Sequence, residues 1–263
     1  MKANAPISRA LLGIAVAALL AAPAIAQDDE FSWSGRIPSG QAIEIKNANG
    51  RLYAEYAPGD QVEVTAIKEG PAGDRAEVEI EVVEHDGGVT ICAVYPGGWL
   101  RSNECAPGDE GHIGSNDNDT EVTFTIKVPA DVKLVATTMN GRIEVEDLRS
   151  DAEVLTMNGR IEISTTGWAH AKTMNGAITA TLGAADWSGD LELQTMNGGV
   201  TVTLPANANT DVNAATMNGE VESDWTLERS GWIRSKARGT IGDGGRGLDI
   251  STMNGNIRIR RGS

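Results

Sequence analysis

Apolar and polar residues alternate along most of the chain after residue 40. The alternation begins in Ala42-Ile43-Glu44-Ile45-Lys46 and returns in Val62-Glu63-Val64 and over residues 76–83, 88–94 and 121–128. A period of two, carried by β-branched residues, is typical of strands that bury one face. No segment after residue 26 keeps apolar residues at helical spacing over three turns. The pattern therefore predicts an all-β protein.

A four-residue sequence, Thr-Met-Asn-Gly, organises the second half of the chain. It occurs six times, at Thr138–Gly141, Thr156–Gly159, Thr173–Gly176, Thr195–Gly198, Thr216–Gly219 and Thr252–Gly255. A degenerate copy, Asn47-Ala48-Asn49-Gly50, comes earlier. The asparagines are 18, 17, 22, 21 and 36 residues apart, and the last interval has room for two units of 18. A recurring unit of about 20 residues predicts stacked supersecondary units.

Side-chain parity can be followed through each unit. Val154 and Thr156 share one face, and Ile161 and Ile163 share one face after Asn158-Gly159. The intervening positions are mostly polar, as at Glu162. The unit is therefore read as strand, corner, strand, corner, with one face buried and a parity reset at each Asn-Gly.

Two folds satisfy this pattern. In a β-solenoid, each strand pairs in parallel with its copy in the next unit, about 4.8 Å away. In the alternative, repeated antiparallel hairpins, the strands on either side of Asn-Gly pair with each other. We favour the solenoid because identical corners gain from stacking Asn on Asn and Thr on Thr, with Gly allowing positive φ at the bend. The predicted corner residues are Asn140, Gly141, Asn158, Gly159, Asn175, Gly176, Asn197, Gly198, Asn218, Gly219, Asn254 and Gly255.

Residues 1–26 are predicted to be a cleaved signal peptide. Lys2 and Arg9 accompany a short apolar run at residues 10–20, and Ala24-Ile25-Ala26 fits an A-x-A cleavage site. The run is shorter than the roughly 20 residues that span a bilayer, and no later segment is apolar enough to do so. We therefore expect an exported protein, in the periplasm or at the cell surface. Residues 27–40 are read as a polar lead-in and residues 41–263 as one β-repeat domain, with irregular strands at 41–130 and regular repeats at 131–261.

The net charge limits the kinds of partner, and the two cysteines agree with an exported location. Without the signal, 20 Lys and Arg face 37 Asp and Glu, a formal net charge of −17. This charge repels phosphate, so we exclude nucleic acid as a partner. The two cysteines, Cys92 and Cys105, are predicted to form a disulfide, as expected of an exported protein. The competing interpretation, a metal or redox pair, fits neither the C-x-x-C spacing nor a zinc pattern.

The repeated T-x-N-G-x-I-x-V pattern resembles a known family. Together with residues 122–134 and the final Gly242-Asp243-Gly244-Gly245 and Leu248–Thr252, it is similar to the bacterial β-strand-repeat family whose members are called "putative adhesins", a domain of unknown function. More distantly it resembles the head domains of autotransporter adhesins. The resemblance covers roughly residues 40–261. It implies a right-handed β-helix-like fold and an exported or envelope location, and it implies no catalytic residues.

Two features have the composition of a metal site. The six motif methionines would form a row of thioethers, which suits a soft metal such as Cu(I). We instead expect methionine to fill an irregular corner, because no His or Cys lies near the motifs.

The loop Asn116-Asp117-Asn118-Asp119-Thr120-Glu121, with Asp109 and Glu110, could offer oxygen ligands to Ca²⁺. It lacks the EF-hand pattern, and we read it as a solvated loop. The single glycine-rich stretch at Gly244–Asp249 is read as a chance match to a calcium-binding repeat. No metal and no cofactor are therefore expected.

The segment Trp225–Arg238 interrupts the repeat and carries the strongest binding signal. It combines Trp225 and Trp232 with basic side chains in an otherwise acidic protein, a composition common in binding hot spots. The candidate binding residues are Trp225, Trp232, Arg234, Lys236 and Arg238. The alternatives are a divergent unit whose basic residues balance nearby acids, or a subunit contact.

No catalytic constellation stands out. The three histidines, His85, His112 and His170, are scattered, and the common hydrolase and phosphate-binding motifs are absent. Glu144, Glu162 and Glu222 would stack in a solenoid, but nearby arginines make a solvated charge lattice the better interpretation. We therefore predict a non-enzymatic, adhesin-like binding or scaffold module of the envelope, whose unidentified partner is an envelope polysaccharide or protein. The alternatives are a carbohydrate-active β-helix enzyme, a lyase or hydrolase, and a regulatory envelope protein that engages a membrane partner.

Overall fold

The computed structural model describes residues 29–97, 102–115, 117–183, 189–230 and 234–262. The predicted signal peptide lies outside these residues. Strands are the main regular structure of the described chain, and its one described helix is α1 (Ala72–Ala76). The all-β prediction is therefore confirmed. In these ranges no helix has the length and apolar character that a membrane crossing requires.

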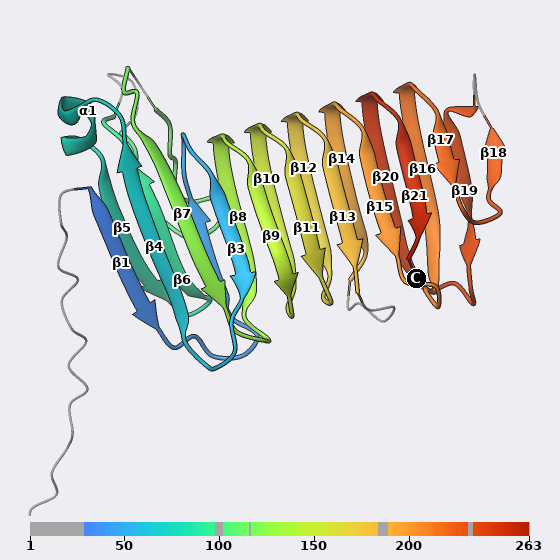
Figure 1. The fold of residues 1–263 in the computed structure, drawn as a ribbon, viewed down its shortest axis with the longest axis horizontal. Coiled ribbons are helices and arrows are strands. Elements are labelled where there is room, and N and C mark those ends of the chain that lie inside the picture. Colours follow the sequence, from blue (N-terminus) through green and yellow to red (C-terminus); the bar gives the residue numbers. More distant parts are fainter. Residues whose placement is uncertain (1–28, 98–101, 116, 184–188, 231–233, 263) are drawn as a thin grey trace, which may run out of the picture.

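Two open sheets lie on either side of one hydrophobic core (Figure 1). Among the described residues the first sheet has ten strands, in the spatial order β1 (Glu30–Gly35), β4 (Val62–Glu69), β7 (Glu121–Val128), β3 (Leu52–Tyr56), β9 (Ile143–Leu148), β11 (Ile161–Thr165), β13 (Ile178–Leu182), β15 (Val200–Leu204), β21 (Ile257–Arg261) and β17 (Val221–Ser223). The second has eleven described strands, in the order β18 (Glu228–Ser230), β19 (Lys236–Ile241), β16 (Thr210–Asn218), β20 (Arg246–Asn254), β14 (Leu191–Asn197), β12 (Ala169–Asn175), β10 (Ala152–Asn158), β8 (Lys133–Asn140), β2 (Ala42–Lys46), β6 (Gly88–Val94) and β5 (Glu79–His85).

The repeating unit of the fold is here called a rung. It is one strand of the eleven-stranded sheet followed along the chain by one strand of the ten-stranded sheet. Each Thr-Met-Asn-Gly copy ends the first strand of a rung, and the strand after it belongs to the other sheet. Rungs pair in parallel and in register, so that Thr156 pairs with Thr138 on one side and with Thr173 on the other. The hairpin alternative is therefore wrong for these repeats, and the fold is solenoid-like.

The spatial order of the rungs differs from their order in the chain. The described rungs run β6–β7, β2–β3, β8–β9, β10–β11, β12–β13, β14–β15, β20–β21 and β16–β17. The rung β20–β21 is inserted between two rungs made earlier, because β20 pairs with β14 on one side and with β16 on the other. The 36-residue interval, which has room for two units of 18, does not contain an extra rung in its described part. Its described part instead contains β18 and β19, which extend the sheet edge in antiparallel pairing.

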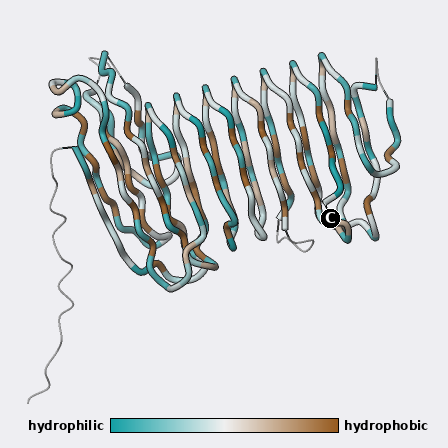
Figure 2. Tube along the Cα trace, in the orientation of Figure 1, coloured by the Kyte–Doolittle hydropathy of each residue, from teal (hydrophilic) through white to brown (hydrophobic). Residues whose placement is uncertain are grey.

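Alternation along the strands builds the core. In β10 and β11, Ala152, Val154, Ile161 and Ile163 are at most 3% exposed, whereas Glu162 is half-buried. Figure 2 shows the same alternation of apolar and polar positions along successive strands. Each Å² of apolar surface that is buried contributes about 25 cal/mol, so burial over this many strands supplies the driving force for folding. Because aromatics are few, the core is built mainly from Val, Ile, Leu and Ala.

The motif asparagines form a continuous hydrogen-bonded row, here called the asparagine ladder. Each side-chain Nδ2 donates to the Oδ1 of the asparagine on the rung before it in space, over 2.7–2.9 Å. Its members, in spatial order, are Asn49, Asn140, Asn158, Asn175, Asn197, Asn254 and Asn218. The degenerate copy therefore belongs to the ladder through Asn49.

The motif threonines and glycines bond and pack against the neighbouring rung. Thr173 Oγ1, for example, donates to the carbonyl oxygen of Gly159 over 3.1 Å. A Cβ placed on Gly176 would lie 1.9 Å from that same oxygen. Gly141, Gly159, Gly176 and Gly219 are not among the glycines with positive φ. The sequence-based reason for glycine was therefore wrong at these four positions: close approach of the next rung, and not positive φ, excludes a side chain there.

Residues at the first end of the stack depart from expectation in two places. β1 lies within residues 27–40, pairs antiparallel with β4 and buries Phe31. The interpretation of this whole segment as a loose polar lead-in is therefore wrong: edge pairing, buried Phe31 and partly buried Trp33, which packs against the core, hold the strand. Residues 72–76 form the helix α1, and the strand expected at 76–83 is found at 79–85 as β5.

Candidate binding face of the eleven-stranded sheet

The solvent side of the eleven-stranded sheet, here called the outer face, displays its side chains in three parallel rows. In-register pairing of the strands places equivalent residues of successive rungs side by side. The polar row contains Glu153, His170, Glu192, Asp249, Asn213 and Arg238. The middle row contains Leu155, Lys172, Gln194, Ser251, Ala215 and Lys236. The methionine row contains Met139, Met157, Met174, Met196, Met253 and Met217.

The methionine row is exposed. Met157, Met174, Met196 and Met253 are each 40–41% exposed and Met217 is 70% exposed, whereas Met139 is half-buried against the core. Together with the middle row, five of these methionines line a groove of about 590 Å³; Met217 lies beyond it. The expectation that methionine fills an irregular corner is therefore wrong for five of the six. Strand parity explains this, because the threonine before each methionine points inward and the methionine must point out.

Charges in the polar and middle rows are paired across rungs. Lys133 contacts Glu153 at 2.6 Å, and Lys172 contacts Glu192 at 3.2 Å. His170 Nε2 lies 3.3 Å from Glu192 without hydrogen-bond geometry. Burial lowers the pKa of His170 below its usual 6.5, and nearby Glu192 opposes this without overcoming it. The ion pairs of the polar row therefore gather around the half-buried imidazole of His170, whereas Asp249 and Arg238 both bond to the Asn213 amide.

Trp168 borders the polar row at its edge. Its ring meets His170 edge-on, with centroids 5.7 Å apart, and the Lys133 ammonium lies 5.6 Å from its centroid. Its indole Nε1 donates to the Asp190 carbonyl. Histidine, tryptophan and lysine thus form a small cluster beside the charged side chains. Trp168 and His170 belong to one rung, whereas Lys133 comes from β8, two strands away, which the sequence does not bring together.

The basic binding residues expected from sequence lie partly on this face. Lys236 and Arg238 are exposed on β19 and continue the middle and polar rows, with Arg238 Nε donating to Asn213 over 3.0 Å. Arg234 is exposed just before β19. Trp225 is half-buried and packs against the core, so it contributes to closing the end of the stack. Trp232 lies outside the described residues.

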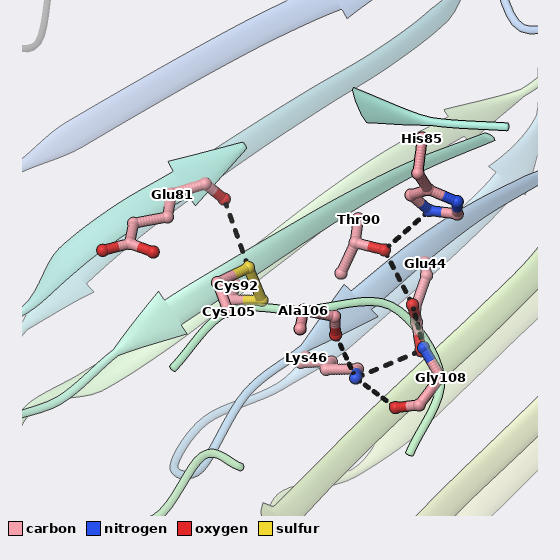
Figure 3. The surroundings of a disulfide bond; sticks show 9 residues. All are labelled: Glu44, Lys46, Glu81, His85, Thr90, Cys92, Cys105, Ala106 and Gly108. Carbon is pink, nitrogen blue, oxygen red and sulfur yellow. Dashed lines mark hydrogen bonds and ion pairs between the residues drawn. A yellow bond between two sulfur atoms is a disulfide. The ribbon is translucent and has the colours of Figure 1, made fainter. Parts of the chain in front are cut away.

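A disulfide pins a loop over the first rungs. Cys92 on β6 is joined to Cys105, as predicted, with Cα atoms 5.7 Å apart. The loop covers a buried ion pair (Figure 3): Lys46 Nζ lies 3.5 Å from Glu44 and donates to the carbonyls of Ala106 and Gly108. Glu44 in turn accepts from Thr90 Oγ1 over 2.7 Å. The loop therefore supplies the polar partners that these two buried charges need.

The acidic segment at 116–121 is only partly solvated, which corrects its interpretation as a solvated loop. Asn118 and Thr120 are buried, and Asn118 Nδ2 donates to the carbonyl of Asp74 over 2.9 Å. Asp119 N donates to the Asp74 carboxylate over 3.0 Å. Asn116 lies outside the described residues. Among the described residues, no cluster of His, Cys, Asp or Glu has the geometry of a metal site.

The carboxylates expected to stack on the ten-stranded sheet do so only in part. Glu144 and Glu162 are register partners, and Arg142 contacts both at 2.5 and 2.7 Å. That contact lowers the pKa of Glu162. Glu222 instead pairs in register with Arg258, several rungs away. The charge-lattice interpretation therefore describes these residues.

A cleft of about 470 Å³ lies at the other end of the same strands. It is lined by three carboxylates, Glu55, Glu146 and Asp147. Tyr53 Oη donates to Glu146 over 2.8 Å, which raises the pKa of Tyr53 to about 12. Asp147 has φ of 48°, beside a register irregularity between β9 and β11, so a local bulge directs it. Sequence parity could not reveal this cleft because a bulge breaks the alternation.

Solved structures and one protein family resemble this chain. No curated protein matches the chain. Matching solved structures include a "putative cell adhesion protein" from Clostridium sporogenes, 12% identical over 88% of this chain and 99% of that chain, with a TM-score of 0.52. They also include a "putative adhesin" from Bacteroides fragilis, 13% identical over 88% and 96%, with a TM-score of 0.34. At such identity the first likeness shows a shared fold alone. The family model described as Toastrack DUF4097 matches residues 36–260, so the chain belongs to that family.

Proposed function

We propose that the chain is a non-enzymatic, adhesin-like binding or scaffold module of the cell envelope, exported to the periplasm or the cell surface. The observation that carries the proposal is the outer face, where a stack of rungs presents straight rows of side chains beside an exposed apolar groove of about 590 Å³. Repeat stacks of this kind offer extended binding surfaces, and exposed apolar grooves mark interaction sites. The names given to the solved structures of similar fold agree with an adhesive role.

The proposed fold has a right-handed course, with Asn-Gly as the corner of each rung. Support comes from the general preference of parallel strand connections for right-handed crossovers. A course of constant hand keeps successive rungs equivalent, so that one outer face runs along the stack. The proposed ligand is an extended envelope polymer, a polysaccharide or a protein segment, that lies along this face and reaches the basic edge formed by Arg234, Lys236 and Arg238.

The test is binding of the purified chain to arrays of envelope polysaccharides and to envelope extracts. We expect Lys236→Ala with Arg238→Ala to weaken binding, because these exposed side chains continue the middle and polar rows of the outer face. The matched control, Lys127→Ala with Arg51→Ala, removes the same charge near the other end of the molecule and should leave binding unchanged. Equal loss in both double variants would point to overall charge and would contradict the proposal. Recovery of a membrane protein alone, with no polysaccharide bound, would favour the regulatory alternative.

The carboxylate cleft favours a second candidate function, cleavage of a polysaccharide. Two carboxyl groups beside a bound sugar are the usual requirement for glycoside hydrolysis. Here Glu55 and Glu146 are register partners on adjacent strands, and Asp147 follows Glu146. If this function operates, the chain releases reducing ends from an envelope polysaccharide and Glu146→Gln abolishes the release while Glu63→Gln does not. Absence of product with the native chain over a polysaccharide panel would rule it out.

A further inference from the structure

Methionine is the one residue of the repeated motif whose side chain neither forms a hydrogen bond between rungs nor is buried between them. Threonine donates to the glycine carbonyl of the neighbouring rung, asparagine joins the asparagine ladder, and glycine admits the close carbonyl. The methionines of the five copies from Met157 onward are instead 40–70% exposed. All the methionines of the chain except Met1 occupy this position. Packing therefore does not account for the choice of methionine here.

The methionine row has the spacing of a chain of two-sulfur sites. Strand pairing is in register on both sides of each methionine, so the backbones of neighbouring methionines are about 4.8 Å apart. Metal–sulfur bonds in proteins are about 2.3 Å long. An ion midway between two sulfurs at the strand spacing would therefore reach both of them with small side-chain adjustments.

We propose that the methionine row binds soft monovalent metal ions, Cu(I) foremost, between thioethers of adjacent rungs. Thioethers select soft ions such as Cu(I) over Mg²⁺ and Ca²⁺. Zn²⁺ is held in proteins by Cys, His and carboxylate ligands, which the row does not supply. Among the described residues that line the groove, Lys172 is the only one with a cationic side chain. Its Nζ is paired with Glu192 at 3.2 Å. The formal net charge of −15 also favours cations. This reverses the expectation of no metal, which rested on methionine as a corner filler.

A purely structural row of stacked apolar side chains makes a different prediction. The inner methionines are less exposed than Met217 at the end of the row, so neighbours do cover one another. Leucine has similar volume and apolar character, and it would preserve that cover. It has no sulfur, so a leucine row keeps packing and loses soft-metal binding. The two roles are therefore separable.

The first experiment titrates the intact chain with Ag(I), a redox-stable probe of the same chemistry, and follows methionine methyl groups by NMR after [¹³C-methyl]methionine labelling. The labels report on the row, because every methionine after the predicted cleavage site lies in it. We expect the row signals to shift with Ag(I), with no shift on adding Zn²⁺. Unshifted row signals, or equal shifts with Zn²⁺, would overturn the proposal.

The second experiment compares variants by Ag(I) titration calorimetry and, without oxygen, by Cu(I) competition with a chromophoric chelator. Met157→Leu, Met196→Leu and Met217→Leu combined remove one member of every adjacent pair in the row and should weaken binding by more than about tenfold, because loss of even an outer-shell partner costs about 10–100-fold. Ile67→Leu with Val82→Leu, at exposed apolar positions outside the row, is the control and should bind as the native chain does. Native affinity in the folded triple variant would contradict the proposal, while the adhesin-like function would be unaffected.

Discussion

Gly176 shows how closely successive rungs approach. The space that its Cβ would take is occupied by the backbone of Gly159, 1.9 Å from the carbonyl oxygen and 2.5 Å from the carbonyl carbon. Backbone atoms cannot move aside as a flexible side chain can. The neighbouring rung therefore requires glycine at this position. The β-propensity of the strand alone does not predict this requirement.

We predict that Gly176→Ala destabilises the protein by about 1–3 kcal/mol or more, the usual range for overpacking. The two rungs must separate to admit the methyl group, which also lengthens the hydrogen bond from Thr173. Urea unfolding measures the loss. The matched control is Gly73→Ala in α1, where a Cβ meets nothing within 4 Å and where alanine should be neutral or slightly stabilising. Equal stability of the two variants would contradict the close approach.

We predict a pH dependence at His170 in the range below 6.5. Because burial lowers its pKa in the folded protein, the unfolded chain binds the proton first as the pH falls, and stability is lost. Glu192 and Glu153 oppose the shift, and Lys172 and Lys133 reinforce it. His170→Gln should therefore lose less stability than the native chain between pH 7.5 and pH 5.5 in urea unfolding. His112→Gln, which removes an exposed histidine, should behave like the native chain; an identical acid loss for His170→Gln would exclude this role.

At the scale of the element, the asparagine ladder links every rung that carries the motif. Asn175 both donates to Asn158 and accepts from Asn197, at 2.8 Å each, whereas Asn218 at the end only donates to Asn254. Bonds in such a row polarise one another in the same direction. The ladder is therefore expected to be strongest in the middle.

We predict that Asn175→Ala costs more stability than Asn218→Ala. The first removes two ladder bonds and the second removes one, and each bond is worth about 0.5–1.5 kcal/mol. Chemical unfolding of both variants provides the measurement. Equal losses would mean that the exposed amides exchange freely with water and that the ladder contributes little.

The sequence predicts the local form of these elements well. Alternation placed β2, β6 and β7 at their observed bounds, and the corner spacing predicted parallel stacking in register. It missed β1, where one buried residue, Phe31, is too weak a pattern to identify a strand. It also missed the outward methionines, because parity within the motif was followed only for the buried threonine.

At the scale of the molecule, the order of rungs could not be predicted. Six copies of one motif match each other equally well, so register is specified locally but the choice of neighbour is not. The choice is made by connections and ends: β19 caps β16, and the long segment before β20 lets that strand return to the interior. The outer face and its groove depend on this order of rungs. Neither could therefore be predicted as a site from the sequence alone.

We predict that Cys92→Ser with Cys105→Ser lowers the stability of the whole molecule by about 3 kcal/mol, as expected for a closed loop of this length. Release of the loop also exposes Glu44 and Lys46 to water at the first end of the stack. Thermal and urea unfolding, with and without a reductant, give the measurement. The native chain in reductant should match the double variant; a much smaller loss would show that the loop stays docked through its hydrogen bonds.

The insertion of β20–β21 has a consequence for synthesis. A chain leaves the ribosome in order, so β16–β17 is available before the rung that finally separates it from β14–β15. An early contact between β14 and β16 would match motif to motif, and β20 must then displace it. We therefore expect a late, slow exchange of partners after translation has passed residue 254, and a nascent chain stalled before β20 should hold a compact but differently ordered stack.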